Sequence, residues 1–110
     1  MLKNKELILL SLNLDLTNKT EIKLKKILEQ YPNSELFAQN IIDFQTSELK
    51  KGIVNIEIDM KEFEQKYNLS TQDFYQQYQS GKLGDDEDYL IWAGIYEMRL
   101  LNQKRLDELE

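Results

Sequence analysis

The stretch that decides the fold is SELFAQNIIDFQTSELKKGIVNIEIDMKEFEQKY, which covers Ser34–Tyr67. Its apolar residues recur at intervals of three and four, a spacing that places them along one side of a helix. The series, interrupted only at Thr46, is Ile42, Leu49, Ile53, Ile56, Met60, Phe63 and Tyr67. At about 1.5 Å per residue, a helix of this length spans roughly 50 Å. Such a helix cannot cover its own apolar side, so we expect the chain's ends, a second copy or another protein to pack against it.

A strand is the competing interpretation for residues 54–60, where apolar and polar residues alternate. Gly52 also disfavours a helix, because glycine costs a helix interior about 1 kcal/mol relative to alanine. However, the helical spacing continues on both sides of the alternation, and no turn residue separates it from Lys61. We therefore predict one helix throughout, with Gly52 as the place where it would bend.

Composition narrows the possible functions. The chain has 110 residues, enough for one domain or two small pieces, and 41% of them are hydrophobic. It contains no cysteine and no histidine, which excludes disulfides and thiolate metal sites and removes the commonest general base. The apolar runs are too short for a membrane span or a signal peptide. We expect a cytoplasmic protein with no cofactor and no small-molecule substrate, and a dimer, because small pieces bury little surface.

Charge is distributed unevenly along the chain. Residues 1–52 carry eight lysines and seven acidic residues, for a net charge of +1, whereas residues 53–110 carry six basic and thirteen acidic residues, for −7. Two halves of different charge suggest two different partners. The alternative is an acidic surface that only keeps the protein soluble. We place the boundary between two regions, 1–52 and 53–110, at Gly52.

The front of the chain predicts one strand followed by two helices. Five apolar residues from Ile8 to Leu16 occupy every second position, so one face of a strand over residues 8–16 would be wholly apolar. A helix over residues 19–30 follows, and Pro32 ends it. Its predicted buried side consists of Leu24, Ile27, Leu28 and Tyr31. A single strand leaves its backbone groups unpaired, so we expect it to pair with the same strand of a second copy.

Three features in the front half of the chain resemble those of a known protein family. They are LNLDLT at residues 12–17, Leu24 and Ile27 in the first helix, and PNS at residues 32–34. In this order and at these lengths, the chain resembles the ribbon-helix-helix DNA-binding domain over roughly residues 7–50. In that family, the outward side chains of the paired strands enter the major groove, and the second helix holds a phosphate at its N-terminus. The DNA-binding residues implied by position are Ser11, Asn13 and Asp15 at the bases, and Asn33 and Ser34 at the phosphate.

The chemistry of these positions supports DNA binding in part. Asparagine can read adenine through two hydrogen bonds, serine can contact either type of base, and helix N-termini bind anions. No lysine or arginine lies among the outward strand residues. Attraction to the phosphate backbone would depend on lysines outside them, at positions 3, 5, 19, 23, 25 and 26. The alternative is that the strand serves only for dimerisation.

The back of the chain predicts a helical hairpin. Ser70 and Asp73 form a variant of the capping box at the start of a short helix over residues 71–79. Gly81 and Gly84 bracket the turn that follows. The last helix runs over residues 86–109.

The acidic turn at residues 85–88 has three interpretations. As a helix cap, Asp85 is the N-cap of the last helix, and the acidic residues after it suit the helix dipole. As a metal site, it lacks the spaced ligands of a calcium loop. As a catalytic carboxylate pair, it has no sign of a substrate pocket beside it. The cap needs no further explanation, so we predict no metal site and no catalytic residues. Because the chain also lacks histidine, cysteine, a glycine-rich phosphate loop and a serine in a nucleophile setting, we predict that it is not an enzyme.

Four segments form a distinctive block in the second half. They are FEQKY at 63–67, FY at 74–75, GKLGDD at 81–86 and DY at 88–89 followed by WAGIYE at 92–97. This block resembles the C-terminal part of small prokaryotic proteins of the antitoxin type. The resemblance implies that the acidic half holds a toxin protein.

The aromatic residues of this block have two possible roles. They can form the core of the hairpin, folded back on Met60, Phe63 and Tyr67. However, small hairpins rarely bury so many, and tyrosine and tryptophan are favoured anchors in interfaces. The residues that we predict to contact a partner are Phe74, Tyr75, Tyr78, Leu83, Tyr89 and Trp92.

Together these features predict a mainly α protein with one N-terminal strand, a long connecting helix and a C-terminal helical hairpin. The predicted function is that of an antitoxin-like transcriptional repressor, which forms a homodimer or a higher oligomer. It would bind operator DNA through a ribbon-helix-helix-like region and neutralise a basic toxin-like protein through its acidic half. The alternative is a helical adaptor or assembly protein that binds no nucleic acid.

Overall fold

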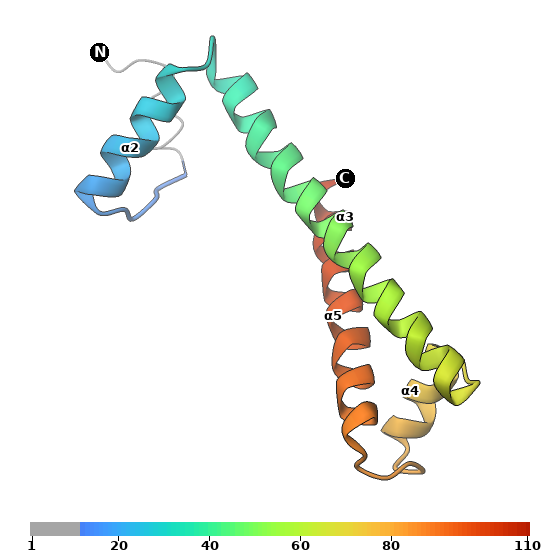
Figure 1. Cartoon of the computed structure of the whole chain (residues 1–110). Coiled ribbons are helices and arrows are strands. Elements are labelled where there is room, and N and C mark those ends of the chain that lie inside the picture. Colours follow the sequence, from blue (N-terminus) through green and yellow to red (C-terminus); the bar gives the residue numbers. More distant parts are fainter. Residues whose placement is uncertain (1–11) are drawn as a thin grey trace. The chain divides into compact units, whose positions relative to one another are not determined.

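The computed structural model describes residues 12–110, and helices account for 79% of this part of the chain (Figure 1). The helices are α2 (Asn18–Glu29), α3 (Ser34–Tyr67), α4 (Thr71–Gln79) and α5 (Glu87–Leu109). The chain divides into two compact units, residues 1–44 and 45–110. We call them the first and the second unit. The division falls within α3, after Phe44, whereas the sequence suggested Gly52 as the boundary.

The structure corrects the prediction of an N-terminal strand over residues 8–16. Residues 8–11 lie outside the described part, but residues 12–16 contain no strand. Leu12 and Asn13 form a turn, and the φ of Asn13 is 50°, in the left-handed region that an extended strand does not allow. The other candidate strand, residues 54–60, is helical. The described chain therefore offers no strand for pairing, and the predicted ribbon-helix-helix-like fold class is wrong.

The first unit contains α2 and the beginning of α3. Thr17 caps α2, since its side-chain oxygen accepts a hydrogen bond from the backbone N–H of Thr20. Asn33 caps α3 in the same way, accepting from the N–H of Leu36 at 2.8 Å. The buried apolar side chains in the described part of this unit are Leu28 and Phe37. Ile27, which the sequence placed on the buried side of its helix, is exposed, as are Leu36, Ile41 and Phe44 of α3.

The prediction of one long helix is confirmed, because α3 runs without a break from Ser34 to Tyr67. It ends where Asn68 adopts a φ of 50°, which lets the N–H of Leu69 bond back to the carbonyl of Glu64 at 3.2 Å. Charged residues lie between the apolar positions along much of its length. Within residues 12–110, no helix combines the length and the apolar character that crossing a membrane requires.

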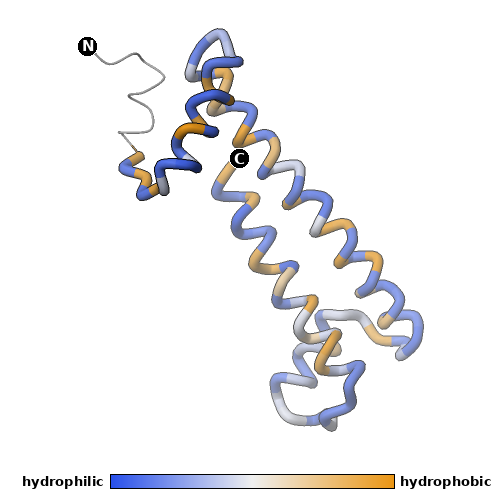
Figure 2. The backbone as a smooth tube through the Cα atoms, turned by 60° about the vertical axis from the view of Figure 1, so that its left-hand side comes forward, coloured by the Kyte–Doolittle hydropathy of each residue, from blue (hydrophilic) through white to orange (hydrophobic). Residues whose placement is uncertain are grey.

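In the second unit, α5 runs back along α3 (Figures 1 and 2). Leu49 and Ile53 of α3 form a buried apolar cluster with Leu106 of α5. Two ion pairs lie beside this contact, from Arg99 to Glu57 at 2.8 Å and from Lys50 to Glu110 at 3.1 Å. A Cβ added to Gly52 would lie 3.4 Å from the side chain of Asn102. Gly52 therefore lies beside α5 with room for a Cβ at an ordinary contact distance.

An aromatic cluster joins α3, α4 and α5 at the other end of this unit. Trp92 of α5 lies between Phe63 of α3 and Phe74 of α4, and it stacks on both rings with centroid distances of 5.5 and 3.8 Å. Trp92 and Phe74 are completely buried. Met60, Phe63 and Tyr67 pack against this cluster, which confirms the prediction that the aromatic residues fold back on them.

Candidate protein-binding site

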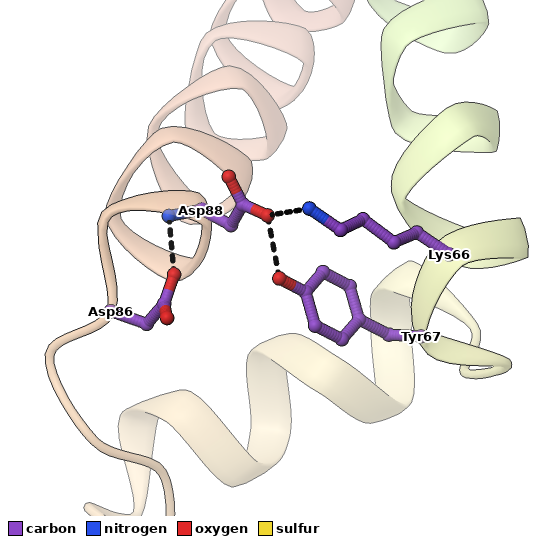
Figure 3. A network of polar contacts seen from close by, with 4 residues as sticks. All are labelled: Lys66, Tyr67, Asp86 and Asp88. Carbon is purple, nitrogen blue, oxygen red and sulfur yellow. Dashed lines mark hydrogen bonds and ion pairs between the residues drawn. The ribbon is translucent and has the colours of Figure 1, made fainter.

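A small polar network connects the end of α3 to the start of α5 (Figure 3). The carboxylate of Asp88 accepts hydrogen bonds from the Lys66 ammonium at 2.6 Å and from the Tyr67 hydroxyl at 2.5 Å. Asp86 caps α5, because its carboxylate accepts from the N–H of Asp88 at 2.8 Å. The acidic turn is thus a helix cap, as predicted, but the capping residue is Asp86 and not Asp85.

The network shifts the titration of its members. The hydrogen bond from Lys66, together with that from Tyr67, holds the pKa of Asp88 below its ordinary value. The same carboxylate raises the pKa of Lys66 and of Tyr67 above their ordinary values. Asp88 therefore stabilises the fold once it is ionised, above about pH 4, whereas the contribution of Lys66 is lost at alkaline pH as its ammonium deprotonates.

Two further hydrogen bonds position α4. The indole N–H of Trp92 donates to the side-chain oxygen of Thr71 at 2.9 Å, inside the core. The backbone N–H of Thr71 donates to the carboxylate of Glu64 at 2.7 Å, which satisfies one of the free donors at the start of α4. Ser70 caps the same helix by accepting from the N–H of Asp73, as the sequence predicted. These bonds fix the three helices around one aromatic core.

An open hollow of about 330 Å³ lies between α3 and α5, beside this core. Its apolar lining comes from Phe63, Ile91 and Ile95. Its charged lining comes from Asp59, Glu62, Lys66 and Asp88. Phe63 and Ile95 also pack against the aromatic cluster, so the apolar side of the hollow belongs to a well-packed part of the unit.

The charges around the hollow differ in their state of pairing. Lys66 and Asp88 neutralise each other within the polar network. Asp59 and Glu62, which are exposed, form no ion pair or side-chain hydrogen bond with any described residue. The hollow therefore presents two unpaired carboxylates next to apolar side chains, an arrangement that suits a long basic side chain with an apolar stem.

The residues expected to contact a partner lie in or against the core. Phe74 and Trp92 have no exposed surface, so neither offers surface to a partner in this fold. Tyr75, Tyr78, Leu83 and Tyr89 are half-buried and pack against the aromatic cluster. The Tyr75 hydroxyl donates to Glu97 at 2.6 Å, and this hydrogen bond raises the pKa of Tyr75. The structure thus assigns these side chains a role in packing.

The residues expected to contact DNA are not brought together as a ribbon. Ser11 lies outside the described residues, and Asn13 and Asp15 are exposed in the turn and in the irregular segment before α2. At the start of α3, the carboxamide oxygen of Asn33 accepts the backbone N–H of Leu36, which is one of the donors that a phosphate would use there. The Ser34 hydroxyl is buried and has no hydrogen-bond partner in the described chain. DNA contact by these five residues stays a prediction, and Asn13 and Asp15 lack the strand that was to present them.

The sequence prediction did not identify the hollow. Each helix carried a signal of its own. On α3, Asp59, Glu62 and Lys66 are three and four residues apart, and on α5, Ile91 and Ile95 are four residues apart. The two sets come together only because α5 folds back on α3. In the part of the chain that the structure describes, no group of three or more acidic side chains is placed to hold a metal ion.

Comparison with known proteins adds no relative. No family model, no curated protein and no solved structure matches this chain. The likeness of the second half to antitoxins therefore stays a prediction.

Proposed function

We propose that the protein is a helical adaptor that binds a basic, partly apolar segment of another protein in the hollow between α3 and α5. The observation that carries the proposal is the pair of unpaired carboxylates, Asp59 and Glu62, beside the apolar side chains of the hollow. An arginine or lysine from the partner would lay its stem on these side chains and direct its charged end to the carboxylates. We also propose that the protein acts in the cytoplasm.

Rigidity favours this use of the site. The stacked rings, the Asp88 network and the Arg99–Glu57 ion pair tie both walls of the hollow to the same core. A site held in its binding shape loses little conformational entropy when a partner binds. The net charge of −7 over residues 53–110 adds long-range attraction for a basic partner.

An antitoxin role is the second candidate, and this negative charge favours it. In that case the segment bound in the hollow belongs to a basic toxin-like protein. The identity of this partner as a toxin rests only on the resemblance of residues 63–97 to antitoxin-type proteins. Operator binding through an N-terminal ribbon is not part of this candidate, because residues 12–16 form no strand.

A peptide-binding experiment tests the site. Fluorescence anisotropy would follow a labelled helical peptide of arginine and leucine, with a glutamate–leucine peptide of the same length for comparison. We expect the full chain to bind only the basic peptide. The variant Asp59→Lys/Glu62→Lys should bind it about tenfold or more weakly, because two attractive charges become repulsive.

The matched control is Glu29→Lys/Asp43→Lys, which makes the same change of net charge in the first unit. If this control weakens binding as much as the hollow variant does, the attraction depends on total charge and the hollow is not the site. If neither variant changes binding, the proposal fails as well.

The two candidate functions separate in a growth assay. The product of the neighbouring gene would be produced alone and together with the full chain. The antitoxin candidate predicts arrest by that product alone and growth when both are present. Normal growth in both cultures would reject the antitoxin candidate and leave the adaptor.

A further inference from the structure

Helix α5 carries apolar side chains on two opposite sides. One side faces the core with Trp92, Ala93 and Leu106. The other side is open, and its apolar residues are about half exposed. These residues are Leu90 at 52%, Ile91 at 47%, Met98 at 55% and Leu101 at 45%. Glu87, Gly94 and Arg105 share this side of the helix, and we call all seven residues the α5 stripe. Figure 2 shows that hydrophobic positions recur along this helix.

The stripe has the spacing of a helix-pairing seam. Ile91, Gly94, Met98 and Leu101 are separated by three, four and three residues, which is the pattern by which one helix packs along another. Glu87 and Arg105 extend the same pattern at the two ends. They are eighteen residues apart, or five turns at 3.6 residues per turn, so they point to the same side. Neither forms an ion pair with a described residue.

Gly94 lies in the middle of the stripe. A Cβ added there would meet no atom within 4 Å, so nothing in the described part of the chain requires a glycine. Glycine is among the least favourable residues for a helix interior. Its bare backbone would let another helix approach closely at this point.

We propose that the α5 stripe pairs in antiparallel orientation with the α5 stripe of a second copy of the chain. One register matches all six positions of the series from Glu87 to Arg105 that are three and four residues apart. Ile91 lies opposite Leu101 of the second copy, Gly94 lies opposite Met98, and Glu87 lies opposite Arg105. Two-fold symmetry repeats each contact.

Charge selects both the occupant and the orientation. Antiparallel pairing places an acidic residue against a basic residue at both ends, whereas parallel pairing would place Glu87 against Glu87 and Arg105 against Arg105. A self-complementary stripe of this kind suits a copy of itself. Because one pair of helices is a small interface, we expect a concentration-dependent dimer with a dissociation constant on the order of micromolar.

This pairing does not rest on the proposed adaptor function. The two surfaces share Ile91 at their edge, but the charged residues that set the register do not line the hollow. Peptide binding and self-association can therefore fail separately.

Sedimentation equilibrium with charge variants of the full chain is the first test. Glu87→Arg and Arg105→Glu should each weaken self-association about tenfold, since each introduces two like-charge contacts per dimer. An equimolar mixture of the two variants should associate like the natural chain, because the mixed dimer has attractive charges at both ends. Lys61→Glu, a similar change on α3, should have no effect.

Cysteine cross-linking is the second test, and it benefits from a chain without cysteine. Under mild oxidation, a mixture of Gly94→Cys and Met98→Cys chains should form a disulfide-linked dimer. Met98→Cys alone should form little, since only parallel pairing brings two copies of this position together. Circular dichroism would show that each variant remains helical.

Three results would overturn the proposal. They are a chain that stays monomeric at several hundred micromolar, a mixture of charge variants that fails to recover association, or cross-linking of Met98→Cys alone with none in the mixture. The last two would reject the register and the orientation even if a dimer forms.

Discussion

Replacing Phe74 by alanine tests whether the aromatic cluster holds the second unit together. Phe74 is completely buried, and its ring stacks on Trp92 at 3.8 Å with an angle of 5° between the planes. Truncating a buried phenylalanine to alanine costs about 3–5 kcal/mol. At roughly 0.05–0.15 kcal/mol per residue, a unit the size of residues 45–110 has a total stability of about 3–10 kcal/mol. We therefore expect Phe74→Ala to remove between about a third and all of the stability of this unit.

Urea unfolding followed by tryptophan fluorescence provides the assay. Trp92 is the only tryptophan in the chain and is completely buried, so its emission should shift to longer wavelength when the second unit unfolds. Phe74→Leu keeps an apolar side chain at the site, and we expect it to cost roughly 1–2 kcal/mol, which stays within the measurable range.

The matched control is Phe44→Ala, which makes the same chemical change at a side chain that is 67% exposed. We expect this control to change the free energy of unfolding by less than about 0.5 kcal/mol. If Phe74→Ala and Phe44→Ala had equal effects, the argument from burial and stacking would be wrong.

Three further predictions concern the second unit. The stability of the natural chain should fall as the pH drops below about 4, because Asp88 has a lowered pKa in the fold and stabilises it only when ionised. Thermal melts between about pH 6 and 2 should show a smaller fall for Asp88→Asn. Thr71→Val should cost about 1–3 kcal/mol in urea unfolding by leaving the Trp92 indole N–H without an acceptor, whereas Thr71→Ser should cost less; an equal loss for both would contradict the role of this hydrogen bond. Gly52→Ala should raise stability by about 0.5–1 kcal/mol, because the added Cβ meets Asn102 at an ordinary contact distance, and a lower melting temperature would show that this contact is too tight.

Local sequence signals predicted the helices well where a cap or a stop residue was present. Ser70 begins α4 as expected, and α3 ends at Tyr67. Such signals act within a few residues, so they do not depend on the rest of the fold. The same signals placed the cap of α5 one residue too early, at Asp85, because both aspartates are suited to the position and only the fold shows that Asp86 accepts the hydrogen bond.

The N-terminal strand shows how a periodic pattern can mislead. Alternation of leucine with polar residues describes which side chains would share a face if the backbone were extended. It does not provide a neighbouring strand, and Asn13 tolerates the left-handed conformation that it adopts here. An alternating pattern requires a partner strand before it becomes a prediction of a sheet.

The sequence by itself determined the helical course of Ser34–Tyr67, the hairpin that follows and the acidic character of the second half, because these depend on spacing, caps and charge along the chain. Only the tertiary structure decided which aromatic residues are enclosed and which charges remain unpaired. Phe74 and Trp92 are identical in kind to interface anchors and became core residues when α5 folded back on α3. The same packing brought Asp59 and Glu62 next to Ile91 and Ile95 and left the α5 stripe uncovered. Burial is a property of the contacts between helices, and the spacing within one helix does not contain it.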